Sequence, residues 1–132
     1  MSNRNKVLIT GGAGFIGAHT VVELIQAGFQ PILVDDLSRS SLKLLKGIRK
    51  IVGFDPEFHQ IDCANTDQLR TVFKRHPDLT QVIHFAAYKS VGESVSDPLL
   101  YYRNNLGSLI SLIGVMNEFK VKHLVFSSSC TV

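Results

Sequence analysis

The segment that most constrains this chain is a glycine-rich stretch near its amino end, TGGAGFIG at residues 10–17. A short apolar run at 6–9 precedes it and predicts a buried parallel strand. After it, apolar residues recur at i, i+3, i+4 and i+7 from Ala18, the spacing of one helix face. Strand, glycine turn and helix in this order form the phosphate-binding start of a nucleotide-binding unit. An ordinary glycine-rich turn is the alternative, because a glycine pattern alone is a weak signal.

Each glycine has an expected physical role. Gly12 would allow the tight turn off the strand, Gly14 would let a pyrophosphate approach the backbone, and Gly17 would let the helix pack closely on the strand. The glycines fit two overlapping spacings, one from Gly12 and one from Gly11, both ending at Gly17. The free N–H groups and the positive dipole end of the helix would then face the phosphates.

Composition is typical of a globular protein. The 132 residues, 45% hydrophobic and 19% charged, suffice for one domain with a core. No apolar run approaches the roughly 20 residues of a membrane span. Residues 1–6 are polar and lead into a strand without a secretory segment. We therefore expect a cytoplasmic protein with no membrane partner.

Charge, cysteine and histidine patterns indicate no further partner or metal. The net charge of +3 is modest and its basic residues are spread over expected helices and a loop, so no nucleic-acid partner is expected. Cys63 and Cys130 form no close pair and are expected to be reduced, packed thiols. Neither they nor the five histidines show metal-ligand spacing, so no metal site is expected.

Strand-like and helix-like segments alternate along the rest of the chain. Gly28 is expected to end the first helix, and Asn65 or Thr66 to begin a later one. Further strands are expected at 31–34, 58–61, 81–85 and 123–126, and helices at 41–52, 66–76 and 98–119. An apolar stripe of the last helix is expected to pack into the core: Leu106, Leu109, Ile110, Ile113 and Met116.

This alternation predicts an α/β fold, a doubly wound parallel sheet of the Rossmann type with helices on both faces. Right-handed crossovers and a glycine turn on the first strand favour the strand order 3-2-1-4-5. The sequence stops shortly after the fifth strand, whereas a full dinucleotide-binding fold usually adds a sixth. We therefore expect residues 1–132 to be one incomplete dinucleotide-binding domain, truncated after the fifth strand.

Acidic residues follow the second and third expected strands. Asp35 stands 18 positions after Gly17, where a dinucleotide fold places the carboxylate that binds the adenosine ribose. This carboxylate would repel a 2′-phosphate, which favours NAD over NADP, although Arg39 nearby could accommodate that phosphate. Asp62 could bind an adenine amino group. Capping of a loop or turn is the alternative for Asp35, Asp36 and Asp62.

Later polar groups are expected at the same edge of the sheet. Lys89, after small residues that end the fourth strand, could reach a ribose or a phosphate, or lie in an exposed loop. Asparagine is a poor interior helix residue, so Asn104 or Asn105 is expected to satisfy buried backbone or cofactor groups. Three serines at 127–129 end the fifth strand. Their hydroxyls could orient a substrate, or simply mark a polar transition from strand to loop.

Together these motifs resemble the extended short-chain dehydrogenase/reductase family, and within it the sugar-nucleotide 4-epimerases. The resemblance covers essentially the whole chain. It rests on TGGAGFIG at 10–17, DDLS at 35–38, HFAAYKSVGES at 84–94, PLLYYRNN at 98–105 and FSSSCTV at 126–132. The glycine turn marks only the broad family, whereas KSVGES with the following PL and YY is more specific to the epimerases.

The resemblance implies an enzyme of galactose metabolism that interconverts UDP-glucose and UDP-galactose through a 4-keto intermediate, with a tightly held NAD as transient hydride acceptor. It also implies a UDP-hexose substrate and a homodimer. Ser129 would be the catalytic residue that orients the sugar. The implied cofactor contacts are Gly11, Gly14, Phe15, Ile16 and Gly17 at the glycine turn, Asp35, Asp36, Leu37, Ser38, Arg39 and Ser40 at the adenosine ribose, Asp62 and Cys63 at the adenine, and Phe85, Ala86, Ala87, Lys89 and Asn104 beside the cofactor.

The chain departs from the family by an absence. The family's base is the tyrosine of a Tyr-x-x-x-Lys motif downstream of the serines, and neither that motif nor the sugar-nucleotide domain is present. We therefore expect the amino-terminal, NAD-binding portion of such an epimerase, inactive by itself, with an apolar edge left open on its fifth strand. The alternatives are a sugar-nucleotide dehydratase or reductase of the same family and a non-catalytic NAD-binding module.

Overall fold

The computed structural model describes residues 5–13, 15–37, 42–85 and 98–127. One parallel sheet has the strand order β3-β2-β1-β4-β5. Its strands are β1 (Lys6–Thr10), β2 (Gln30–Asp35), β3 (Glu57–Gln60), β4 (Gln81–His84) and β5 (His123–Phe126). The helices are α1 (Phe15–Gln26), α2 (Leu42–Val52), α3 (Thr66–Arg75), α5 (Pro98–Tyr101), the π-helical segment η1 (Tyr102–Leu106) and α6 (Gly107–Glu118). The predicted doubly wound sheet and its strand order are confirmed.

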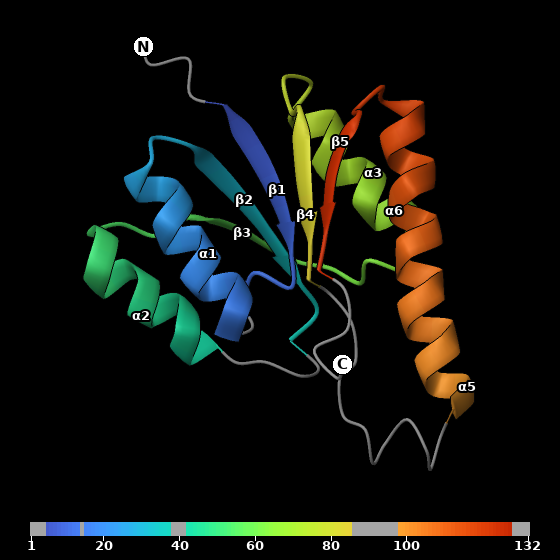
Figure 1. Cartoon of the computed structure of the whole chain (residues 1–132), viewed down its shortest axis with the longest axis horizontal. Coiled ribbons are helices and arrows are strands. Elements are labelled where there is room, and N and C mark those ends of the chain that lie inside the picture. The colour runs from blue at the N-terminus through green and yellow to red at the C-terminus, as the bar shows by residue number, and fades with distance from the viewer. Residues whose placement is uncertain (1–4, 14, 38–41, 86–97, 128–132) are drawn as a thin grey trace.

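The helices form two layers with the sheet between them. Helices α1 and α2 lie on one side, and α3 and α6 on the other (Figure 1). The side chains of β1 explain this division, because they alternate between the two faces. Val7 and Ile9 pack towards α1 and α2, whereas Leu8 packs towards α3 and α6. Both faces are therefore apolar, as expected for a parallel sheet covered on both sides.

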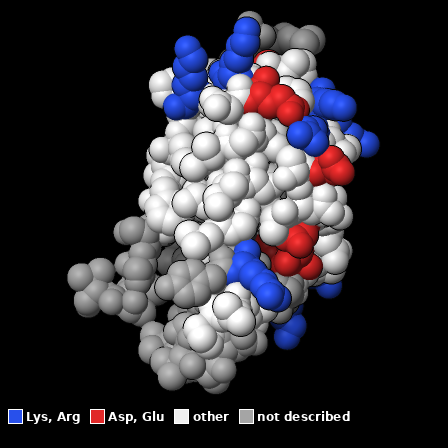
Figure 2. All heavy atoms as spheres, turned by 90° about the vertical axis from the view of Figure 1, so that its right-hand side faces the viewer, with Lys and Arg blue, Asp and Glu red and all other residues white. Residues whose placement is uncertain are grey.

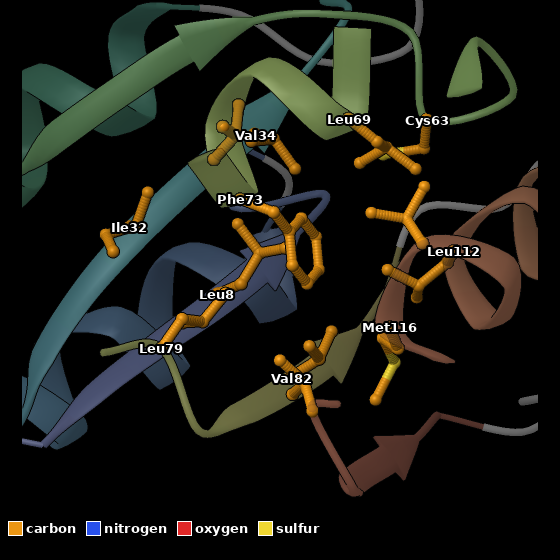
Figure 3. Packing of buried hydrophobic residues seen from close by; sticks show 13 residues of the cluster. Leu8, Ile32, Val34, Cys63, Leu69, Phe73, Leu79, Val82, Leu112 and Met116 are labelled. Carbon is orange, nitrogen blue, oxygen red and sulfur yellow. The ribbon is translucent and has the colours of Figure 1, made fainter. Parts of the chain in front are cut away.

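The larger core cluster lies between the sheet and α3 and α6. Phe73 of α3 is fully buried among Leu8, Val82 and Leu112 (Figure 3). Its ring also stands 5.7 Å from that of Phe119, measured between centroids. Removing so large a buried ring lowers the free energy of unfolding by about 3–5 kcal/mol in comparable cores. The packing of Phe73 on Leu8 and Val82 therefore holds α3 against the sheet.

The expected signals at the ends of two helices are confirmed. Gly28 has a φ of 93°, and the Phe29 N–H donates to the Leu24 carbonyl at 2.9 Å, which closes α1. The side chain of Asn65 accepts the Gln68 N–H at 3.2 Å and caps α3. The outer bounds of the elements agree with the expected ones to within one residue.

The stripe predicted for the last helix was wrong in part. Met116 is buried as expected, but Leu106, Ile110 and Ile113 are exposed, at 49%, 70% and 47%. Helix α6 is apolar on most sides, so periodicity alone could not select its inner face. That face carries two serines, because small side chains allow close packing, and the Ser111 hydroxyl lies 3.0 Å from that of Thr66 on α3.

Among the described residues, no helix combines the length and apolar character that crossing a membrane requires.

Candidate functional site

The carboxyl ends of the strands lie together at one edge of the sheet, at the lower side of Figure 1. We call this the carboxyl edge. The chain leaves β1 towards α1 on one face, whereas the helices after β4 lie on the other. Because β1 and β4 are neighbours, the strand order reverses between them. Ligands of open α/β sheets bind outside the carboxyl ends at such a switch point.

The glycine turn leaves β1 at this switch point. Gly11 has a φ of 74°, in the left-handed region that favours glycine, and its N–H donates to the Val34 carbonyl at 2.8 Å. The turn therefore depends on Gly11 and not on Gly12 as predicted. Gly12 serves packing instead, since a Cβ there would stand 2.7 Å from Cγ of Leu33 on β2.

Gly17 brings α1 against the turn. A Cβ on Gly17 would stand 2.2 Å from the Gly11 carbonyl oxygen and 3.1 Å from Cα of Gly12. Both are backbone atoms, which cannot rotate away as a side chain can. The predicted close packing by Gly17 is confirmed, and it holds the first turn of α1 at the carboxyl edge. The N–H groups of that turn are a general anion-binding feature of helices.

Asp35 ends β2 beside the glycine turn. Asp35 is buried, with 8% of the residue exposed. It accepts the Ala13 N–H at 3.2 Å through Oδ2 and the Leu37 N–H at 2.8 Å through Oδ1. Asp35 therefore has the loop-capping role that was the alternative to ribose binding. An ionised carboxylate accepts about four hydrogen bonds, so this role is compatible with ribose binding. Leu37 has a φ of 65°, an unfavourable value for leucine.

Asp62 and Cys63 follow β3 nearby. Asp62 Oδ1 accepts the Ala64 N–H at 2.9 Å. Asp62 therefore has the turn-forming role that was the alternative to adenine binding. Cys63 is buried, and burial together with the charges of Asp62, Asp35 and Asp36 raises the pKa of its thiol to about 12. Its reactive thiolate is scarce near neutral pH. The prediction that Cys63 is packed is confirmed by its burial.

A buried polar pair joins β1 to β4, and the sequence reasoning missed it. Thr10 Oγ1 lies 2.6 Å from His84 Nδ1 and accepts the Phe85 N–H at 3.0 Å. The His84 ring stacks on Phe126 of β5, with centroids 5.7 Å apart. The available signal was a threonine and a histidine at the ends of two apolar strands, where carboxyl-edge groups are expected. Three adjacent strands are thereby fixed at the switch point.

The asparagine pair lies in η1, where the helix widens to a π-turn. Such π-turns occur often at functional sites. The Asn105 carbonyl accepts the Ser108 hydroxyl at 3.2 Å, and Asn105 is partly buried. This hydrogen bond uses the backbone carbonyl of Asn105, so the expected role of an asparagine side chain stays a prediction. The π-turn interrupts an otherwise regular helix.

The remaining predicted site residues are placed as follows. Ile16 and Asp36 are exposed, and Phe85 is partly buried. For Phe15 and Asn104 only the backbone lies within the description. Eight predicted residues, together with Cys130, lie outside the described residues: Gly14, Ser38, Arg39, Ser40, Ala86, Ala87, Lys89 and Ser129.

The model of the NAD dependent epimerase/dehydratase family matches residues 7–132. The chain is 48% identical over 128 residues to the UDP-glucose 4-epimerase of Dictyostelium discoideum. This match covers 97% of this chain and 37% of that protein. It is 45% identical over 133 residues to that of Mus musculus, over 96% of this chain and 38% of the relative.

Solved structures agree in fold. The UDP-glucose-4-epimerase from Stenotrophomonas maltophila with bound NAD and formylated UDP-arabinopyranose has a TM-score of 0.92 at 43% identity, over 98% of this chain and 38% of that one. The enzyme from Bifidobacterium longum in complex with NAD+ and UDP has a TM-score of 0.92 at 42% identity, over 97% of this chain and 38% of that one. The chain thus spans less than two fifths of the length of these relatives.

Proposed function

Because the chain belongs to the NAD dependent epimerase/dehydratase family, we propose that its carboxyl edge binds NAD and that residues 1–132 form the cofactor-binding portion of a UDP-glucose 4-epimerase. The observation that carries this proposal is the bracing of the glycine turn by Asp35, whose carboxylate accepts the Ala13 N–H at 3.2 Å. This contact joins the turn that would bind the phosphates to the carboxylate that would bind the ribose.

The pyrophosphate of the cofactor would lie at the first turn of α1. The described geometry fits this group, because the missing side chain of Gly17 brings the helix to within contact distance of the Gly11 carbonyl. Backbone N–H groups of Phe15 and Ile16 would face the phosphates, and the helix dipole favours their negative charge. Gly14 would let the pyrophosphate approach the backbone.

The adenosine would lie across the ends of β2 and β3. Asp35 would accept hydrogen bonds from the ribose hydroxyls, and Asp36 through Ser40 would line that end. The carboxylates of Asp35, Asp36 and Asp62 make this end negative, which opposes a 2′-phosphate and supports NAD over NADP. Asp62 and Cys63 would contact the adenine.

The nicotinamide end would lie over β4 and β5. A bound NAD supplies the acceptor for a hydride from the sugar. The chain's own residues would position the reactants there. Lys89 would hold the nicotinamide ribose, with Phe85, Ala86, Ala87 and Asn104 beside it, and Ser129 would orient the sugar hydroxyl. The buried Thr10–His84 pair supports this arrangement by fixing β4 against β1.

The substrate would be a UDP-hexose, which would place the protein in galactose metabolism in the cytoplasm. Two solved relatives support this class, being described in complex with NAD+ and UDP and with UDP-glucose. The tyrosine base and the region that binds the sugar nucleotide would come from a segment beyond Val132, in line with the greater length of the relatives. A dehydratase or reductase of the same family is the second candidate, since the family description names both epimerases and dehydratases.

We also propose that the protein is a homodimer that pairs through α6. Figure 2 shows that this side of the molecule has a broad uncharged centre. Helix α6 and the residue before it carry three exposed apolar side chains, Leu106, Ile110 and Ile113. Exposed apolar patches of this kind mark interaction surfaces. Ile110→Glu should convert a dimer to a monomer in sedimentation velocity, and an unchanged dimer would refute this surface.

Cofactor affinity and product formation test the proposed function. In the complete protein, calorimetry should show one NAD per chain and weaker binding of NADP. Asp35→Ala should weaken NAD binding by about 1–3 kcal/mol, whereas Asp55→Ala, at an exposed carboxylate paired with Arg49, should leave it unchanged. Incubation with UDP-glucose should yield UDP-galactose by chromatography. NAD binding without any product would favour the non-catalytic module, and a dehydrated product would favour the dehydratase.

A further inference from the structure

A histidine cluster lies away from the carboxyl edge, at the start of β3. Glu57 and His59 stand two residues apart on this strand, so both side chains point to the same face. His76, at the carboxyl end of α3, reaches the same place. His59 Nε2 and His76 Nε2 each lie 2.6 Å from Glu57 Oε2. The three potential ligand atoms are all within 4.8 Å of one another.

Sequence spacing could not show this cluster. His59 and His76 are 17 positions apart, with a helix between them. Their approach depends on the crossover from β3 through α3, which returns the chain towards the amino ends of the strands. The expectation of no metal site rested on sequence spacing alone, whereas the fold brings these two histidines together across that spacing.

The donor set is one that zinc prefers. Two imidazole nitrogens and one carboxylate oxygen form a known three-ligand Zn²⁺ set, with water in the fourth position. His76 is buried, whereas Glu57 is exposed and His59 is intermediate. An ion could therefore enter from the Glu57 side while the buried ring is held in place. We propose that Glu57, His59 and His76 bind one Zn²⁺ ion per chain, through Oε2 of the glutamate and Nε2 of each histidine.

Lys6 opposes this binding. Its ammonium lies 3.2 Å from His76 Nδ1 and 2.9 Å from Asp78 Oδ1. An ammonium only donates, so in the metal-free protein Nδ1 accepts and the ring proton lies on Nε2, towards Glu57. Zinc at Nε2 requires the proton on Nδ1, and Lys6 must then leave that nitrogen. The ammonium can remain with Asp78, whose side chain is 61% exposed.

The bound ion would join β3 to the end of α3. This link exists only in the folded chain, so zinc should raise the unfolding temperature. At a free zinc concentration about 100 times the dissociation constant, the expected rise is roughly 10 °C for a domain of this size. The site stands apart from the proposed NAD site, so NAD affinity should change little.

Calorimetric titration of metal-free protein with zinc chloride tests the proposal. We expect one ion per chain, binding weakened at least about tenfold in His59→Ala and strengthened in Lys6→Gln. His123→Ala, at an exposed histidine on β5, is the matched control and should bind zinc as the parent does. Histidine nitrogen NMR should show the His76 proton moving from Nε2 to Nδ1 on zinc addition.

Several results would overturn the proposal. These are no saturable zinc binding by the parent protein, equal affinity in His59→Ala, or no gain in Lys6→Gln. The last variant keeps all three ligands, so it remains informative if loss of a histidine prevents folding.

Discussion

Substitution of Gly17 by alanine should destabilise the protein, although alanine is the better helix former. Gly17 lies in the first turn of α1, and the added Cβ would stand 2.2 Å from the Gly11 carbonyl oxygen. It would also stand 3.0 Å from the Gly11 carbonyl carbon. Real Cβ contacts are not this short, so the helix and the glycine turn must move apart.

The expected magnitude is the difference between two opposing effects. Overpacking in a well-packed region costs about 1–3 kcal/mol. Replacing glycine by alanine within a helix gains about 0.5–1 kcal/mol. Because the clash at Gly17 involves rigid backbone, we expect the upper part of the first range and a net loss of about 1–2 kcal/mol. The displaced turn should also bind NAD less tightly.

Gly47→Ala in α2 is the matched control. A Cβ there would meet nothing within 4 Å, so the same substitution should stabilise the protein by about 0.5–1 kcal/mol. Urea unfolding gives the free energy for both variants, and calorimetry gives the NAD affinity. If Gly17→Ala were as stable as Gly47→Ala and bound NAD as the parent does, the close approach of α1 to the turn would be refuted.

Three further substitutions test individual contacts. Lys120 follows α6 with a φ of 59°, so Lys120→Gly should raise the free energy of unfolding by up to about 1 kcal/mol in urea, and a loss would contradict the left-handed cap. Thr10→Val keeps the shape but removes the buried hydroxyl that contacts His84, and thermal unfolding should show a loss of about 1–3 kcal/mol, whereas an unchanged midpoint would argue against the pair. The pKa of Glu57 lies below its ordinary 4.5, because hydrogen bonds from its two histidines outweigh the raising effect of burial. Its stabilising contribution is thus present above about pH 4.5 and is lost as the pH falls through the lowered value, so Glu57→Gln should flatten the acid limb of a stability profile.

The sheet and its order could be predicted from the sequence because each signal was local. Apolar runs, the glycine turn and Asn65 each act within a few residues, and right-handed crossovers then leave few possible topologies. The position of Asp35 was predicted in the same way, from its distance to Gly17. Its bond to the Ala13 N–H was not, because two segments must already be paired for it to form.

The features that the sequence did not indicate depend on tertiary contacts. Helix α6 is apolar on most sides, so its inner face is decided by the close packing of Ser111 on Thr66 and not by hydropathy. Gly11 and Gly12 adjoin in the chain, and only the backbone path shows which one takes the positive φ. The cluster around Glu57 likewise needs the complete crossover between β3 and α3.

A crystal structure of the complete protein with NAD would locate the cofactor directly. We expect the pyrophosphate on the N–H groups of the first turn of α1, close to Gly17, and the adenosine ribose on the carboxylate of Asp35. NAD bound elsewhere, or at this edge without a contact to Asp35, would contradict the proposal that these residues form the cofactor site.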